Sequence, residues 1–313
     1  MGATPLTVTF FRGLSAAGKS TLARELAAKT GAIRLNLDSL REMAGQPWSQ
    51  ENEKFIQAQQ DEMALAALRS GRSVIVDNTH LVEKGPRRLA TRIWEEGLNV
   101  GYDLIDVTVS SDECRHRNMV RRNSPTADDS LSVPDHVIVA QADLWAKEVR
   151  RGPWTIESIH RGLPEIVPYE IPSGEVYQRP TVLCDIDNTL ALMVDRGPYD
   201  HDKCGGDELN HPVARTIAAL RFNGHRIVLC SGRDSKHRGV TEDWLFRKDV
   251  TYDDLLMREE GDVRRDSVVK LELFDRHIRY TTRVTHVLDD RDRVVSVWRA
   301  LGIPCFQVNP GNF

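Results

Sequence analysis

Cysteine is scarce in this sequence, and long apolar stretches are missing from it. The five cysteines among 313 residues are odd in number, lie far apart and form no C-x-x-C pair, which argues against a disulfide framework and against a zinc site. No uncharged apolar stretch reaches the roughly 18 to 20 residues that cross a bilayer, and the N-terminus has no basic segment followed by a long apolar run. We therefore expect a protein of the cytoplasm that has no membrane partner.

An excess of positive charge is missing as well. The formal net charge of −4 at pH 7 excludes a protein that coats duplex nucleic acid with a broad basic face, but not an enzyme that grips a few terminal phosphates. A hydrophobic content of 40% and a charged content of 28% are typical of an ordinary globular chain. The length of 313 residues favours two domains over a single core.

Strand-like and helix-like segments alternate in two series. The first series runs over residues 6–149, the second begins at Thr181–Cys184, and five prolines interrupt the segment between them. Such alternation predicts an α/β fold in which each half has a parallel sheet flanked by helices. The predicted division is a first domain over residues 1–152, a Pro-rich linker over 153–180 and a second domain over 181–313.

A phosphate-binding pattern lies between the first predicted strand and the first predicted helix. Residues 13–20 fit G-x-x-x-x-G-K-[ST] in the strand–turn–helix context that the motif requires. The loop amides and the helix N-terminus would hold phosphate oxygens, while Lys19 would reach the β and γ phosphates and the Ser20 hydroxyl would ligate Mg²⁺. The residues expected to bind the nucleotide are Gly13, Ser15, Ala16, Ala17, Gly18, Lys19, Ser20 and Thr21.

Two acidic residues follow strands near this loop. The guanine-reading N-K-x-D tetrapeptide is absent, whereas Asp38 ends the second predicted strand, with Arg41 three residues later. A carboxylate at this place could take the proton of an attacking hydroxyl as the γ-phosphoryl group departs, although an N-cap of the helix over 39–44 is the simpler alternative for Asp38 alone. Asp77 could be an acid associated with magnesium or a strand-end cap.

Arginines gather on a later predicted helix that leads into a polar loop. A lid that carries arginines over a nucleotide would offset the charge of the transition state. For any single one of these arginines, the solvated face of a basic helix is the favoured explanation. The group consists of Arg115, Arg117, Arg121 and Arg122.

In the second half, acidic residues mark the ends of two predicted strands. Thr181–Cys184 leads into Asp185-Ile186-Asp187-Asn188-Thr189, which resembles the D-x-D-x-T signature of the haloacid-dehalogenase (HAD) phosphatase superfamily. Ser231-Gly232-Arg233, Lys270 and Asp289-Asp290 stand in the order of the later motifs of that superfamily. The alternative for each of these residues is a strand-end cap or a surface lysine.

The resemblance implies a covalent phosphatase mechanism. Asp185 would attack phosphorus to give an aspartyl-phosphate, and Asp187 would protonate the leaving oxygen and later activate water. Ser231 and Lys270 would hold the non-bridging oxygens of the phosphate. Crowded carboxylates repel one another without a cation, and oxygen ligands of this kind select Mg²⁺. The expected metal ligands here are Asp185, Asp187, Asp289 and Asp290.

The pairing of the two sites resembles the phage polynucleotide 5′-kinase/3′-phosphatase family over almost the entire chain. In the first half, Asp38 and Arg41 match the general base and the acceptor-binding arginine of the family, which favours a catalyst over a cap for Asp38. Arg122 matches the start of the family's lid. The lid of the family continues with another arginine, which is replaced here, so Arg122 is favoured as the transition-state arginine over Arg117 and Arg121. The similar segments of the second half include 196–200, 231–233, 258–270 and 288–291.

This likeness implies a nucleic-acid end-healing enzyme. One domain would move the γ-phosphate of ATP to 5′-hydroxyl ends of RNA or DNA, the other would remove 3′-phosphates with Mg²⁺, and a ligase would use the products. Further implied site residues are the catalytic Arg233 and two contacts of the substrate phosphate, Arg196 and Arg258. A homo-oligomer is compatible with the family, and the cytoplasm would be that of the host if a phage encodes the chain.

Two alternatives remain open from the sequence. A bifunctional small-molecule enzyme could join a nucleoside or metabolite kinase to a phosphatase. A non-catalytic binding protein could use its nucleotide site only to control assembly, although it would not require both Asp185 and Asp187. Trp48, in the segment 45–50, could contact an acceptor strand or belong to the core.

Overall fold

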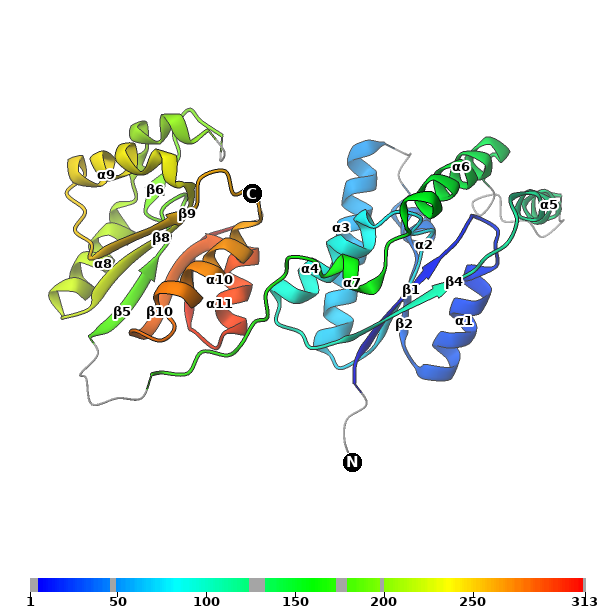
Figure 1. The fold of residues 1–313 in the computed structure, drawn as a ribbon, viewed down its shortest axis with the longest axis horizontal. Helices are drawn as coiled ribbons and strands as arrows, with labels where there is room; N and C mark the ends of the chain where they lie inside the picture. The colour runs from blue at the N-terminus through cyan, green and yellow to red at the C-terminus, as the bar shows by residue number, and fades with distance from the viewer. Residues whose placement is uncertain (1–4, 46–48, 124–132, 173–178, 198–199, 312–313) are drawn as a thin grey trace. The chain divides into compact units, whose positions relative to one another are not determined.

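The computed structural model describes residues 5–45, 49–123, 133–172, 179–197 and 200–311, which form two compact units (Figure 1). The first unit comprises Met1–Trp94 and Leu98–Gly162, and the second comprises Glu95–Gly97 and Leu163–Phe313. Each unit has a parallel sheet with helices around it, so the predicted α/β class is confirmed. Within the described part of the chain, no helix has the length and apolar character needed to cross a membrane. Trp48 lies outside the described residues.

The first unit is built on a four-stranded parallel sheet in the order β2-β3-β1-β4. Alternate residues of β1 pack on opposite faces: Val8 and Phe10 join one apolar cluster, and Phe11 joins another with Ala23 and Ile75. A continuous apolar run is what a strand covered on both faces requires. The elements are β1 (Thr7–Arg12), α1 (Lys19–Thr30), β2 (Ile33–Leu35), α2 (Leu37–Ala44), α3 (Gln50–Arg69), β3 (Val74–Asp77), α4 (Lys84–Glu95), β4 (Gly101–Asp106), α5 (Ser111–Arg122), α6 (Asp135–Arg151) and α7 (Ile156–Ile159).

The first unit continues beyond the boundary predicted at residue 152. Trp154 and Ile159, which fall in the predicted linker, are 4% and 0% exposed and belong to the main core of this unit. The Trp154 indole also donates a hydrogen bond to the carbonyl oxygen of His80 at 2.8 Å and covers the Arg12 guanidinium. The start of the linker at residue 153 is therefore wrong, because apolar side chains beyond Pro153 still pack on the first sheet.

The second unit has a five-stranded parallel sheet in the order β11-β10-β5-β8-β9. Buried aromatic side chains such as Trp244 and Trp298 fill the space between this sheet and its helices. The elements are β5 (Pro180–Cys184), β6 (Ala191–Leu192), the 3₁₀ helix η2 (His201–Gly206), β7 (Glu208–Leu209), α8 (His211–Phe222), β8 (Arg226–Asp234), η3 (Ser235–His237), α9 (Arg238–Arg247), β9 (Asp254–Arg258), α10 (Asp266–His277), β10 (Arg283–Arg291), α11 (Asp292–Ala300) and β11 (Cys305–Gly311).

Strand order brings the predicted residues together in each unit. Because the strands of each sheet run parallel, their carboxyl ends meet at one edge. In the first unit this edge carries the loop after β1, Asp38 after β2 and Asp77 at the end of β3. In the second unit β5 lies between β10 and β8, so the segment after β5 has the acidic end of β10 on one side and the end of β8 on the other.

Candidate active sites

The loop between β1 and α1 has the backbone of a phosphate-binding loop. Gly13 and Gly18 have φ values of 155° and 101°, and a Cβ atom on Gly13 would lie 2.5 Å from the carbonyl oxygen of Val107. Lys19 is buried, and its Nζ donates hydrogen bonds to the carbonyl oxygens of Gly13 at 3.0 Å and Leu14 at 2.7 Å. Burial lowers the pKa of Lys19. The other predicted nucleotide contacts, Ser15, Ala16, Ala17, Ser20 and Thr21, lie in the same loop and in the first turn of α1.

A glutamine that the motif does not include contacts this loop. Gln141 of α6 accepts a hydrogen bond from the Ser15 amide at 2.8 Å and donates one to the Ser15 hydroxyl at 3.0 Å. These two contacts fix the part of the loop that precedes Lys19. No local pattern in the sequence points to Gln141, because α6 lies more than a hundred residues away along the chain.

Asp38 does not cap its helix. Asn36 is the N-cap of α2, and its side chain accepts a hydrogen bond from the Ser39 amide at 3.1 Å. Asp38 lies in the first turn, 59% exposed, and forms an ion pair with Arg41. The alternative of a cap is therefore wrong, and the carboxylate is accessible. Its negative charge also raises the pKa of Lys19.

Arg41 is held on its other side by an acidic residue of α3. Its Nε and Nη2 donate to the two carboxylate oxygens of Glu53 at 2.9 Å and 2.8 Å. The hydrogen bonds from Arg41 lower the pKa of Glu53. Glu53 was not predicted as a site residue, since an acid on the first turn of a helix is also explained by the helix dipole.

Asp77 lies buried at the end of β3. One carboxylate oxygen accepts hydrogen bonds from Arg34 Nε at 2.9 Å and Nη2 at 2.5 Å. The other, Oδ1, has no hydrogen-bond partner among the described residues. Asp77 also raises the pKa of Lys19. Its carboxylate therefore acts electrostatically on Lys19, and one of its buried oxygens has no partner in the described part of the chain.

Of the arginines on α5, Arg117 contacts the phosphate-binding loop. Its Nη1 donates to the carbonyl oxygen of Ala17 at 3.2 Å, and its Nε pairs with Glu113 at 2.7 Å. Arg121, one turn later, lowers the pKa of Lys19 by its charge and so faces the same side. Arg122, the favoured transition-state arginine, is an exposed residue at the end of α5. The preference for Arg122 is not matched by the geometry, because the helical period turns positions 117 and 121 toward the loop.

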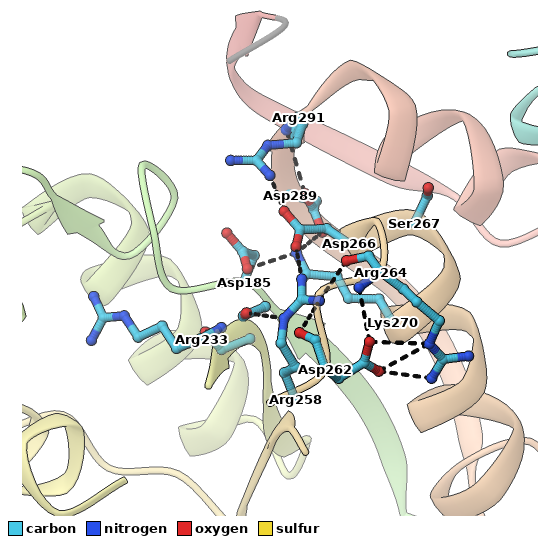
Figure 2. Close-up of polar contacts among 12 residues, drawn as sticks. Asp185, Arg233, Arg258, Asp262, Arg264, Asp266, Ser267, Lys270, Asp289 and Arg291 are labelled. Atoms are coloured by element: carbon cyan, nitrogen blue, oxygen red, sulfur yellow. Dashed lines mark hydrogen bonds and ion pairs between the residues drawn. The ribbon is translucent and has the colours of Figure 1, made fainter. Parts of the chain in front are cut away.

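In the second unit, buried acids surround Lys270 (Figure 2). Lys270 Nζ donates to Asp185 Oδ1 at 2.6 Å and to Asp289 Oδ2 at 2.7 Å. Trp298 Nε1 also donates to Asp289 Oδ2, at 3.1 Å. Burial raises the pKa of Asp185 to about 8 and that of Asp290 to about 7, and the neighbouring carboxylates act in the same direction. A group of this kind requires more positive charge than Lys270 alone provides.

Three of these acids fit a metal ion. Asp185, Asp289 and Asp290 each offer an oxygen, and these atoms lie within 4.8 Å of one another. An all-oxygen set of carboxylates suits Mg²⁺. Asp187, predicted as a fourth ligand, is not in this group, because its Oδ2 accepts from Arg233 Nε at 2.9 Å and its Oδ1 from Arg233 Nη2 at 2.8 Å. The other three predicted ligands group without Asp187, so its role as a metal ligand stays a prediction.

Arg196 does not face the substrate cavity. Its side chain is 0% exposed and pairs with Asp187 and with Asp207. Burial opposes ionisation of Asp187, yet the charges and hydrogen bonds of Arg233 and Arg196 lower its pKa to about 2. The predicted contact between Arg196 and a substrate phosphate is therefore not what the structure has, since its Nε and Nη2 bind carboxylates and its Nη1 donates to the Gly197 carbonyl oxygen.

A cavity of about 440 Å³ opens over the acidic cluster. Asp185, Asp187, Lys270, Asp290 and Arg258 are among the residues that line it. Arg258 donates to the carbonyl oxygens of Gly232 at 2.7 Å and Asp262 at 3.0 Å and pairs with Asp266, so it braces the wall of the cavity (Figure 2). The Ser231 hydroxyl is buried and accepts a hydrogen bond from the Arg233 amide at 3.2 Å.

Two further residues at the cavity were not assigned a role from the sequence. Asp266, at the start of α10, accepts from both Arg258 and Arg291. A Cβ atom on Gly232 would lie 2.7 Å from Asp266 Oδ1, so this carboxylate packs closely against the end of β8. Both Asp266 and Arg291 lie within segments that resemble the polynucleotide 5′-kinase/3′-phosphatase family. This resemblance is the one sequence feature that points to a role for these two residues.

Known families match both halves of the chain. Residues 179–313 match the polynucleotide kinase PNKP phosphatase domain, and residues 8–146 match the AAA domain. A curated relative from Autographa californica nuclear polyhedrosis virus, a putative bifunctional polynucleotide kinase/RNA ligase, is 37% identical over 140 residues, which are 44% of this chain and 20% of the relative. The match thus spans about a fifth of the length of that relative.

Solved structures provide two further similarities. A chain of the Pnkp1/Rnl/Hen1 RNA repair complex is 27% identical, with 100% of this chain and 98% of that chain covered and a TM-score of 0.47. A putative kinase from Chloroflexus aurantiacus is 20% identical, with 45% and 78% covered and a TM-score of 0.37. The first half of the chain is thus similar to an AAA domain, and the second half to the phosphatase domain of a polynucleotide kinase.

Proposed function

We propose that this protein heals nucleic-acid ends. The first unit would transfer the γ-phosphate of ATP to a 5′-hydroxyl end of RNA or DNA, and the second would remove a 3′-phosphate. The proposal is supported above all by the pairing, in one chain, of a phosphate-binding loop with a buried acidic cluster around Lys270. The match of the second half to a polynucleotide phosphatase domain supports a nucleic-acid substrate over a small metabolite.

In the kinase reaction, the oxygen of the 5′-hydroxyl forms a bond to the γ-phosphorus while the bond to the bridging oxygen of ADP breaks. Asp38, exposed in the first turn of α2, takes the proton of the hydroxyl. Arg41, oriented by Glu53, binds a phosphate of the acceptor strand. Lys19 exchanges its carbonyl partners for phosphate oxygens when the nucleotide binds, since those carbonyls compensate the same charge.

In the phosphatase reaction, an Asp185 carboxylate oxygen attacks phosphorus and the bond to the ribose 3′-oxygen breaks, with the proton of Asp187 moving to that oxygen. Water then attacks the aspartyl-phosphate, its proton returns to Asp187, and inorganic phosphate leaves. Lys270, 2.6 Å from Asp185, favours the ionised nucleophile that burial alone would disfavour. Mg²⁺ held by Asp185, Asp289 and Asp290 would supply the additional positive charge that the incoming phosphate requires.

Asp187 must change its protonation state during this cycle. With two arginines as partners its pKa is about 2, so the carboxylate is ionised and suited to accept the proton of water. A substrate phosphate dianion in the cavity adds negative charge beside it and raises that pKa. Proton donation to the leaving oxygen therefore belongs to the substrate-bound enzyme.

The products of the two reactions are a 5′-phosphate and a 3′-hydroxyl, the pair of ends that a ligase joins. We therefore propose a ligase as the enzyme that acts next. The name of the viral relative combines a polynucleotide kinase with an RNA ligase, which favours RNA over DNA as the substrate. A homo-oligomer and a location in the cytoplasm are proposed from the family resemblance alone.

The proposed function is tested with labelled ATP and a 5′-hydroxyl oligonucleotide, with phosphate release from a 3′-phosphate oligonucleotide measured in parallel. Lys19→Ala or Asp38→Ala should abolish only the transfer, and Asp185→Ala only the release. Equal loss of both activities from every variant would contradict two separate sites. Mononucleosides that compete equally with oligonucleotides would favour a small-molecule enzyme instead.

A further inference from the structure

A closed network of two carboxylates and two guanidinium groups lies beside the phosphatase cavity. Asp207, between η2 and β7, is 0% exposed. Its Oδ1 accepts from Arg196 Nε at 2.7 Å, and its Oδ2 accepts from Arg196 Nη2 at 2.5 Å and from Arg233 Nη2 at 3.1 Å. Both arginines also donate to Asp187. Asp207 is therefore one guanidinium group away from Asp187, without being among the residues that line the cavity.

We propose that Asp207 is a positioning residue of the phosphatase, which fixes the Asp187 carboxylate for proton transfer by orienting Arg196 and Arg233. The inference rests on the proposed 3′-phosphatase function and adds a residue to it. A guanidinium group presents its N–H donors in a rigid planar fork. A carboxylate that binds one side of each fork therefore determines which donors remain for Asp187.

Charge balance supports this role. The two arginines and the two aspartates of the network sum to zero, and Arg196, Arg233 and Asp207 are withdrawn from water. Without Asp207, two buried cations would share a single carboxylate, and they would repel each other and seek other partners. Asp187 would then lose the two-sided hold that gives its oxygens a defined direction.

The backbone around Asp207 is anchored on the core of the second unit. Nε1 of Trp244, a buried side chain of α9, donates to the Asp207 carbonyl oxygen at 2.8 Å. Arg233 Nη1 donates to Thr241 Oγ1 of the same helix at 3.2 Å. The network thus connects the segment between β6 and β7 to the end of β8 through a rigid helix, as a positioning device requires.

The test compares Asp207→Asn with Glu208→Gln in the full-length protein. Asp207→Asn keeps the shape of the side chain and removes its charge, whereas Glu208 is the exposed neighbouring acid and serves as the matched control. We expect Asp207→Asn to lower kcat for a 3′-phosphate oligonucleotide by about 10- to 100-fold, as is typical for a supporting residue behind a catalytic one, with KM nearly unchanged.

A second substrate separates positioning from general damage. p-Nitrophenyl phosphate has a leaving group that departs without a proton, so its kcat/KM does not depend on Asp187 as an acid. We expect Asp207→Asn to lower kcat/KM for the oligonucleotide at least about tenfold more than for the nitrophenyl ester. Partial unfolding removes active enzyme and lowers both values equally, so the ratio remains informative where stability falls. The double variant Asp207→Asn/Arg196→Gln should change this ratio no further, since both residues act through one network.

The inference is overturned by a loss in Asp207→Asn no larger than that in Glu208→Gln, or by an equal loss for the two esters. A wild-type protein that releases no phosphate from the 3′-phosphate oligonucleotide overturns the proposed function itself. Transfer to 5′-hydroxyl ends, a property of the first unit, should remain at the wild-type level in all of these variants.

Discussion

Removal of the Lys270 ammonium group should destabilise the second unit in a magnesium-dependent manner. Lys270 is 3% exposed, and its Nζ lies 2.6 Å from Asp185 Oδ1 and 2.7 Å from Asp289 Oδ2. Methionine has a similar length and no charge, so Lys270→Met leaves these two carboxylates and Asp290 crowded together without that cation. A metal ion on the same three carboxylates would restore the missing charge.

The size of the effect follows from the burial of the pair. Breaking a buried ion pair by removing one partner costs about 3 to 5 kcal/mol. For a domain of roughly 150 residues or more, each kcal/mol shifts Tm by about 2 to 4 °C. Without Mg²⁺ we therefore expect the second unit of Lys270→Met to unfold about 6 to 20 °C below that of the wild type. A ligand present at about 100 times its Kd stabilises by about 2.7 kcal/mol, so Mg²⁺ should recover a large part of the loss.

The measurement is thermal unfolding with EDTA and with Mg²⁺, combined with peptide-resolved hydrogen–deuterium exchange to follow the second unit. Lys236→Met is the matched control, because Lys236 is an exposed lysine that lines the same cavity. It should unfold like the wild type under both conditions. The reasoning is refuted if Lys270→Met is as stable as the wild type in EDTA, or if Mg²⁺ stabilises the variant no more than it stabilises the wild type.

Three further predictions concern the first unit. Burial lowers the pKa of His80 to about 4, below the value of about 6.5 in the unfolded chain, so the unfolded state binds the proton more readily. The free energy of unfolding should thus be highest above about pH 6.5 and fall by up to roughly 3 kcal/mol as the pH drops toward 4. In urea titrations, the free energy of unfolding of His80→Gln should depend less on pH than that of the wild type. Gly13→Ala places a Cβ atom 2.5 Å from a backbone carbonyl oxygen and should abolish binding of a fluorescent ATP analogue. Gly31→Ala, at another positive φ but in open space, should retain that binding. Arg117→Ala should lower kcat/KM for ATP by about tenfold or more, because a charge-assisted contact is lost. A larger loss in Arg122→Ala would instead favour Arg122, the lid arginine predicted from the sequence.

The architecture and the position of both sites could be predicted from the sequence because they depend on local patterns. Apolar runs such as Thr181–Cys184 identify strands, and a polar residue directly after such a run lies at the carboxyl edge of a parallel sheet. Asp185 and Asp289 follow this rule and meet as predicted. The phosphate-binding loop is equally local, since its backbone shape is encoded by Gly13 and Gly18 within a few residues of Lys19.

Pairing between distant elements could not be predicted in this way. Gln141 reaches Ser15 from α6, and Glu53 reaches Arg41 from α3, through contacts that depend on how helices pack on the sheet. A single polar residue on an amphipathic helix gives no sign of such a partner. The predicted linker starts too early for a similar reason. The prolines near Trp154 suggest the end of the first domain, but the side chains there still pack on the core of the first unit.

Arg196 shows why the partner of a charged residue decides its role. Arginine was predicted to contact a substrate phosphate because its planar fork suits phosphate oxygens, but the same fork suits carboxylates equally well. Burying a guanidinium group costs several kcal/mol unless it is fully paired, so a side chain that is 0% exposed must have acidic partners inside the protein. Asp207 and Asp187 are those partners, and they bind its Nε and Nη2 donors. For an arginine in an acidic segment beside a buried strand, the first partner to consider is therefore a carboxylate of the same domain. Contact with substrate requires an exposed guanidinium group.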